Sequence, residues 1–122
     1  MSHRSQYERN KAHPDRFGLP EYRAKLKKAS QLPEYMRLSN LTVDSMIEYI
    51  MLGRPVGHFL SAVFSNDMLG AFSHADQQNA MSMGLIVQFL YNEAPAGCWG
   101  SAEKSKTWME HRGMEGIARK GK

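Results

Sequence analysis

Cysteine is nearly absent from this chain: its 122 residues include one, Cys98. A single thiol excludes a disulfide framework and a structural zinc site built from cysteines. Long hydrophobic runs are lacking as well, since the richest apolar stretch, residues 85–91, falls far short of the roughly 18 residues that span a bilayer. The first sixteen residues contain no apolar segment of the kind that a secretory signal requires. We therefore expect a protein of the cytoplasm with no membrane partner.

Motifs that bind nucleotides or metal ions are also missing. Neither glycine-rich phosphate loop, Gly-x-Gly-x-x-Gly or Gly-x-x-x-x-Gly-Lys-Ser/Thr, occurs, and no two histidines have the His-x-x-x-His spacing of a metal site. The alternation typical of β-strands never lasts four residues between turn signals. We expect no cofactor, no bound metal and no sheet.

Basic residues are scarce in the middle of the chain. Residues 41–100 hold five acidic residues and one basic residue, Arg54, whereas residues 1–40 carry a net charge of +5 and residues 101–122 carry +3. Basic flanks around an acidic centre are typical of arms that meet phosphates or an acidic partner. The same pattern also arises when charged arms only keep a protein soluble.

Helical periodicity is the clearest pattern present. Apolar residues recur at helical spacing over residues 43–51, with Thr42 as the expected cap, Gly53 as the expected end and Pro55 barring continuation. The sequence therefore predicts an all-α fold, a small helical bundle with a basic, partly extended N-terminal arm.

Two further helices are expected after Pro55. One opens near Gly57 and carries the apolar residues of 59–64 inward. It either bends at Asn66–Asp67 or Gly70 or continues through residues 68–72. The next begins at Asp76 and is apolar nearly all round over residues 81–91. Such a helix is typically surrounded by protein or completed by a second subunit.

The domain organisation follows from these helices. A last helix is expected from Ser101 to Gly113, followed by a flexible basic tail over residues 113–122. The helical core is placed at residues 41–112 and the basic arm at residues 1–40. The arm should contain two short helices, because Leu19-Pro20-Glu21-Tyr22 recurs as Leu32-Pro33-Glu34-Tyr35 and proline suits a first helical turn.

Polar side chains gather near the ends of the apolar helix, and we expect them to line a surface that binds a ligand or a partner. Amide, carboxylate and phenol groups can line a pocket for a polar ligand, although such residues also commonly cap helices. The guanidinium of Arg54 could hold a phosphate or carboxylate, or form an ordinary surface salt bridge. The expected binding residues are Asn66, Asp67, Asp76, Asn79, Tyr91, Asn92, Glu93 and Arg54.

Two alternative functions stay open. Four basic residues of the arm could bind nucleic acid without sequence preference: Arg23, Lys25, Lys27 and Lys28.

The other alternative is a small hydrolase or metal enzyme that uses Asp67, His74 and Asp76. If one helix continued through residues 66–74, Asp67 and His74 would share a face. On such a continuous helix, His58 would point about 160° away from His74 and could not join them.

Five short motifs lie within about residues 45–108. They are Gly57-x-Phe59-Leu60-x-Ala62-Val63, Asn66-Asp67-x-Leu69, Ala75-Asp76 with Asn79, Tyr91-Asn92-Glu93-x-Pro95 and Cys98-Trp99-Gly100-Ser101. Together they resemble a group of small proteins encoded by bacteriophages and prophages. The resemblance implies a phage context and transfers no catalytic role.

From this context we expect a non-enzymatic binding protein of the host cytoplasm. It would capture a host protein or a small ligand and modulate host defence or physiology. A homo-oligomer is a further expectation, because the apolar helix could be completed by a second copy of the chain.

Overall fold

The computed structural model describes residues 19–120, and every regular element in that range is helical, which confirms the all-α prediction. In chain order the elements are α2 (Leu19–Ser30), η1 (Pro33–Tyr35), α3 (Asn40–Leu52), α4 (His58–Phe64), α5 (Met68–His74), α6 (Gln77–Met81), α7 (Met83–Glu93), η2 (Ala96–Cys98), α8 (Ala102–Glu110) and α9 (Gly113–Lys120), where η1 and η2 are short 3-10 helices. No helix in the described range is both long enough and apolar enough to cross a bilayer. The first 18 residues of the expected arm lie outside this range.

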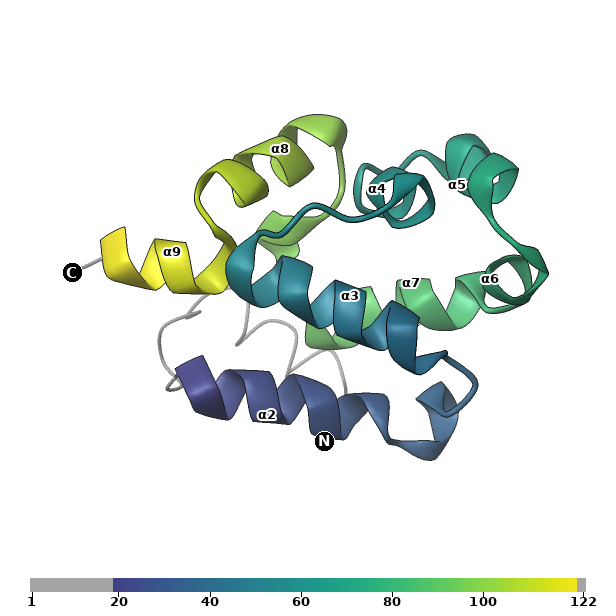
Figure 1. The fold of residues 1–122 in the computed structure, drawn as a ribbon, viewed down its shortest axis with the longest axis horizontal. Coiled ribbons are helices and arrows are strands. Elements are labelled where there is room, and N and C mark those ends of the chain that lie inside the picture. The colour runs from purple at the N-terminus through teal and green to yellow at the C-terminus, as the bar shows by residue number, and fades with distance from the viewer. Residues whose placement is uncertain (1–18, 121–122) are drawn as a thin grey trace.

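Helix α3 runs through the middle of the molecule, with α2 on one side, α4 and α8 on the other, and α9 beyond its C-terminal end (Figure 1). Its start is capped by Ser39, whose Oγ accepts a hydrogen bond from the backbone N–H of Thr42 at 3.1 Å. The helix therefore begins earlier than expected, and the cap is Ser39 and not Thr42. Gly53 ends the helix in the left-handed conformation, with φ of 67°, as expected.

Tyr49 of α3 lies at the centre of the core and is fully buried. Its hydroxyl donates to the carbonyl oxygen of Cys98 at 2.7 Å and lies 2.8 Å from the Oγ of Ser105. The ring of Phe64 stacks on the Tyr49 ring at 3.9 Å, and the Nε1 of Trp108 donates to the Tyr49 carbonyl at 3.0 Å. These contacts join α3, α4, η2 and α8 around one side chain.

Helix α2 belongs to the same core. Tyr22 and Leu26 are buried, and the Tyr22 hydroxyl donates to the backbone carbonyl of Glu93 at 3.1 Å. The boundary expected at residue 41 therefore does not separate two packed units, because α2 supplies one wall of the core. Spacing along the chain could not reveal this, since the partners of Tyr22 lie about seventy residues away.

The chain bends sharply between α4 and α5. Asn66 has φ of 61°, a left-handed conformation that asparagine tolerates better than most residues. The two short helices therefore fold back on each other as an antiparallel hairpin, and one continuous helix does not form. Of the alternatives left open by the sequence, the bend at Asn66–Asp67 is the one observed.

Helices α6 and α7 replace the single apolar helix expected from Asp76. Ser82, with φ of −96° and ψ of 2°, separates them. Ile86 and Phe89 are fully buried, whereas Val87 on the opposite side of α7 is half exposed and Met81 of α6 is 80% exposed. Within this single chain the segment is not fully enclosed, because the break at Ser82 lets one face of α7 pack on the core while Met81 faces solvent. Completion by a second subunit, the other expected arrangement, stays a prediction.

The C-terminal region also differs from expectation. Helix α8 ends at Glu110, and residues 113–120, expected as part of a flexible tail, form α9 and bury Met114. Gly113 has φ of 68°, and a Cβ there would lie 2.6 Å from the backbone nitrogen of Gly53. Two glycines thus let the start of α9 cross the end of α3 at close range, which places α9 on the core.

Candidate functional site

The eight expected binding residues do not form one surface. Four lie in the turns that begin α5 and α6: Asn66, Asp67, Asp76 and Asn79. Three form the last turn of α7: Tyr91, Asn92 and Glu93. Helix α7 has eleven residues and is about 16 Å long, and Asp76 and Asn79 precede its start, so these two residues and the group in its last turn lie at opposite ends of it. Asp67 instead shares a hollow with Ala102 of α8. The eighth residue, Arg54, follows the end of α3.

The carboxylates at the α5–α6 end act as helix caps. The Oδ1 of Asp67 accepts from the backbone N–H of Gly70 at 3.0 Å, and the Oδ1 of Asp76 accepts from that of Asn79 at 2.7 Å. The Thr42 hydroxyl donates to the Oδ1 of Asn79 at 3.4 Å, which ties α6 to α3. Capping, the structural alternative for these residues, is therefore what the geometry shows, and both carboxylates remain exposed.

A groove of about 980 Å³ separates η1 from α6 and α7. Its lining combines the carboxylates of Glu34 and Asp76 and the guanidinium of Arg37 with the apolar side chains of Met81 and Leu85. Of these lining residues, only Asp76 is among the binding residues that the sequence predicts. The others were missed because they come from two segments about forty residues apart that only the fold brings together.

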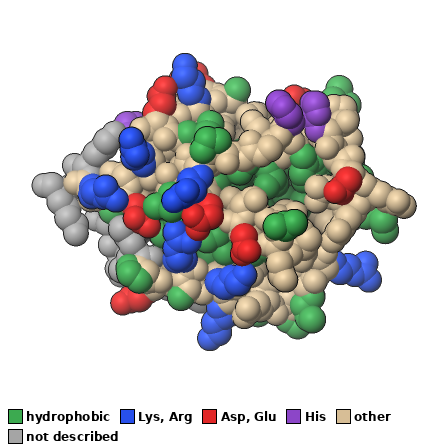
Figure 2. Space-filling model, in the orientation of Figure 1, with side chains coloured by type: hydrophobic (Ala, Val, Ile, Leu, Met, Phe, Trp, Pro, Cys, Tyr) green, Lys and Arg blue, Asp and Glu red, His purple; other side chains and the backbone are tan. Residues whose placement is uncertain are grey.

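Large apolar side chains also stand in solvent on α5 and α6. Met68, Leu69 and Phe72 of α5 are all exposed, Leu69 to 79%, and Met81 of α6 joins them. Figure 2 shows hydrophobic side chains at this end of the molecule, farthest from α9 in Figure 1. The sequence left open whether these three residues continue the preceding helix, and the structure places them on a separate helix that faces solvent. The bend at Asn66 leaves α5 packed mainly on α4, with Ala71 as its buried contact.

The other end of α7 is structural. The Nδ2 of Asn92 donates to the Tyr35 hydroxyl at 3.0 Å, and Glu93 is only 5% exposed. Burial is the main cause that raises the pKa of Tyr35; the bond from Asn92 opposes it, and the carboxylate of Glu93 adds to it. The half-exposed ring of Tyr91 lies 6.3 Å from that of Trp99. These residues hold α7 on η1 and the core, and Glu93 offers little surface to a ligand.

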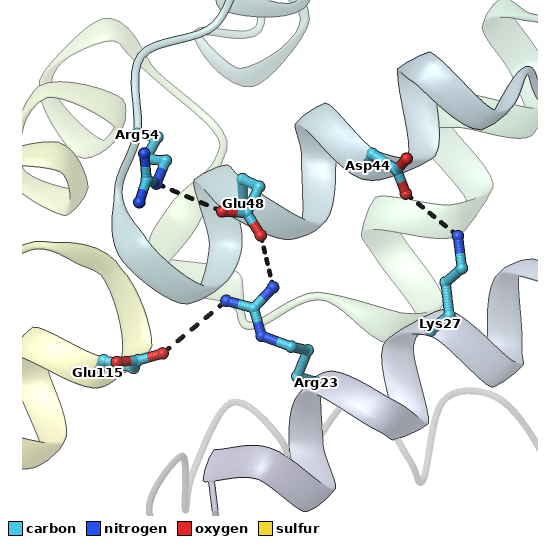
Figure 3. A network of polar contacts seen from close by, with 6 residues as sticks. All are labelled: Arg23, Lys27, Asp44, Glu48, Arg54 and Glu115. Carbon is cyan, nitrogen blue, oxygen red and sulfur yellow. Dashed lines mark hydrogen bonds and ion pairs between the residues drawn. The ribbon is translucent and has the colours of Figure 1, made fainter.

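Two of the four basic residues proposed to bind nucleic acid form ion pairs within the molecule. Arg23 lies against Glu48 of α3 and 3.9 Å from Glu115 of α9, while the Nζ of Lys27 is 3.1 Å from Asp44 (Figure 3). These pairs hold α2 on α3. The basic face of α2 is therefore partly neutralised, which weakens the case for phosphate binding.

Arg54 forms the surface salt bridge that the sequence left as an alternative. Its Nε lies 3.3 Å from a carboxylate oxygen of Glu48 (Figure 3). It also lines a cavity of about 620 Å³ with Arg112 and Arg119, together with two glutamates, Glu110 and Glu115. The carboxylates offset most of the positive charge, so an anion gains little at this position.

The residues that could support catalysis are used otherwise. Asp67 and Asp76 cap helices, and the His74 ring stacks on that of His58, the residue that a continuous helix would have turned away. Cys98 is fully buried, which raises the pKa of its thiol well above the usual value and keeps it protonated. Within residues 19–120, no three His, Cys, Asp or Glu side chains are arranged to hold a metal ion.

Comparison of the chain with protein-family models, with curated proteins and with solved structures gives no match. The resemblance to small phage proteins therefore stays a prediction.

Proposed function

We propose that this chain is a non-enzymatic binding protein that captures a partner protein at its α5–α6 end. The observation that carries the proposal is the set of exposed apolar side chains on α5 and α6: Met68, Leu69, Phe72 and Met81, of which Met81 also lines the groove. Single exposed apolar residues are ordinary, but several on two consecutive short helices are typical of a surface that a partner covers.

The chemistry of this end suits a protein and not a small metabolite. Two of the four side chains are methionines, whose flexible thioethers adapt to irregular apolar partners. The neighbouring groove adds the carboxylates of Glu34 and Asp76 and the amides of Gln77 and Gln78. A segment that carries apolar side chains and backbone hydrogen-bonding groups complements such a lining.

The resemblance to phage-encoded proteins supports a host protein as the partner, with interference in host defence or physiology as the result. Nucleic acid is the weaker candidate, because Arg23 and Lys27 are engaged with carboxylates of α3. A hydrolase is weaker still, since Asp67 and Asp76 cap helices.

Site-specific photo-crosslinking tests the proposal with a matched control. The photoreactive residue p-benzoylphenylalanine replaces Phe72 of α5 in one chain and Tyr91 of α7 in another; both are aromatic and both are 46% exposed. Each chain is expressed in the host bacterium and irradiated. We expect a defined host protein to be crosslinked from position 72 at least about tenfold more than from position 91, and Leu69→Ser to reduce that product without changing the circular dichroism of the chain.

Three results would overturn the proposal. Equal crosslinking from both positions would show a surface without preference for a partner. A product from position 91 alone would move the binding site to the far end of α7. A product of twice the chain mass, with concentration-dependent dimers in analytical ultracentrifugation, would make a second copy of the chain the occupant.

A further inference from the structure

Two methionines of the proposed docking surface present their thioethers to solvent. Met68 of α5 is 66% exposed and Met81 of α6 is 80% exposed. Methionine is among the residues most often buried, and Met51 and Met114 in the core are at most 1% exposed. In the described part of the chain one further methionine, Met36 after η1, is exposed to a similar degree, 71%, but it lies on neither α5 nor α6.

A thioether in solvent can be oxidised, whereas a packed core shields its sulfur from the oxidant. Hydrogen peroxide is the oxidant that we consider. A lone pair of the sulfur attacks one peroxide oxygen, the O–O bond breaks as the S–O bond forms, and the second oxygen leaves as water after taking up the proton of the first. The sulfur loses two electrons and the peroxide gains them. The product, methionine sulfoxide, is polar and is returned to methionine by methionine sulfoxide reductases.

We propose that Met68 and Met81 are sites of reversible oxidation, and that their oxidation by a peroxide switches off capture of the partner. The switch rests on the proposed function, since it acts on the surface that the partner covers. A partner that buries both side chains would have to desolvate two polar sulfoxide oxygens, which costs free energy where no hydrogen-bond donor meets them. The fold itself should tolerate the change, because both side chains stand in solvent.

Peptide mapping of the full-length chain tests the sites of oxidation without any partner. The purified chain is treated briefly with dilute hydrogen peroxide, digested, and analysed by mass spectrometry for peptides that gain one oxygen atom. Met68 and Met81 should be oxidised at least about tenfold faster than Met51 and Met114, because only the first two present their sulfur to solvent. Oxidation of all four at one rate would overturn the inference.

Crosslinking from position 72 tests the switch. The full-length chain with p-benzoylphenylalanine at this position is oxidised, freed of peroxide, mixed with an extract of the host bacterium and irradiated. Oxidation should reduce the crosslinked product at least about tenfold, and the two methionine sulfoxide reductases, one for each sulfoxide epimer, should restore it. The circular dichroism of the oxidised chain should not change, which separates loss of binding from loss of fold.

Leucine substitutions assign the effect to particular methionines. A chain with both Met68→Leu and Met81→Leu keeps apolar side chains of similar size that a peroxide does not oxidise, so it should capture the partner before and after treatment. The matched control is Met36→Leu, which removes an equally accessible thioether elsewhere and should leave the chain as sensitive as before.

The outcomes separate the switch from the proposed function. A crosslink that peroxide leaves unchanged, or one that peroxide abolishes equally in the double leucine variant, contradicts the switch alone. Loss of peroxide sensitivity in Met36→Leu would assign the effect to the wrong surface and also overturn the switch. Absence of a crosslink from the untreated chain would contradict the proposed function and the switch with it.

Discussion

The surroundings of Tyr49 and the α5–α6 end are built from similar residues in opposite ways. Around Tyr49, residues from α3, α4, η2 and α8 bury one another. The Tyr49 hydroxyl and the Trp108 indole N–H both form hydrogen bonds inside this core. At the α5–α6 end, Leu69 and Met81 stand in solvent, and the hydrogen bonds are local caps within single turns. The first region has the features of a part that sets stability, and the second those of a part that binds.

The largest expected difference in stability comes from removing a phenylalanine ring from each of the two regions. Phe64→Ala removes a fully buried ring that stacks on the Tyr49 ring at 3.9 Å, and it should lower the free energy of unfolding by about 3–5 kcal/mol. Phe72→Ala removes a half-exposed ring on α5 and should cost under about 1 kcal/mol. Urea unfolding measures both, and similar losses for the two variants would mean that α5 belongs to the stable core.

A pair of glycines tests the crossing of α3 and α9. Gly113→Ala places a Cβ 2.6 Å from the backbone nitrogen of Gly53 at a positive φ, and it should cost about 2–4 kcal/mol. Gly84→Ala, in α7 with nothing within 4 Å of the new Cβ, should stabilise the chain by about 0.4–1 kcal/mol. Thermal unfolding should move the two midpoints in opposite directions, and a shared direction would contradict the close crossing.

The buried tyrosines predict how stability depends on pH. Burial raises the pKa of Tyr22 and of Tyr49 above 10, the ordinary value that both have in the unfolded chain. Below pH 10 these two tyrosines are protonated in both states and do not change the stability; the Cys98 thiol, whose pKa burial also raises, already ionises above about pH 9 in the unfolded chain. Above pH 10 only the unfolded chain releases these protons, and each tyrosine should lower the free energy of unfolding by up to about 1.4 kcal/mol per pH unit.

Urea midpoints between pH 8 and 11.5 check this expectation. Tyr22→Phe removes one of the groups whose pKa burial raises and should make the decline above pH 10 shallower. An equally steep decline in the variant would mean that Tyr22 is ionised in the folded chain.

The smallest effect is expected at a cap of the exposed end. Asp67→Ala removes the acceptor for the Gly70 N–H and should cost about 1 kcal/mol, whereas Asp67→Asn keeps an oxygen acceptor and should cost less. The difference in midpoint between the two variants measures the cap. If Asp67→Ala abolishes partner crosslinking while Asp67→Asn retains it, the capping oxygen, and not the charge, supports the binding surface by holding the start of α5.

The local features of the fold could be predicted from the sequence because they depend on neighbouring residues. Gly53 ends α3, Asp76 caps α6 and Ser101 caps α8, as expected from side chains that satisfy the backbone within one turn. The candidate site was predicted less well. Asp76 lines the groove, but Glu93 is buried, and residues 33–37 of the groove could not be recognised from their local sequence.

The sequence by itself determined that the described chain is helical and where most helices begin, since capping and periodicity act over a few residues. Only the tertiary structure decided which apolar residues are buried and which distant residues meet. Met81 and Ile86 are equally apolar in the sequence, yet the break at Ser82 leaves one in solvent and buries the other. His58 and His74 meet for the same reason, because one backbone conformation at Asn66 redirects everything that follows it.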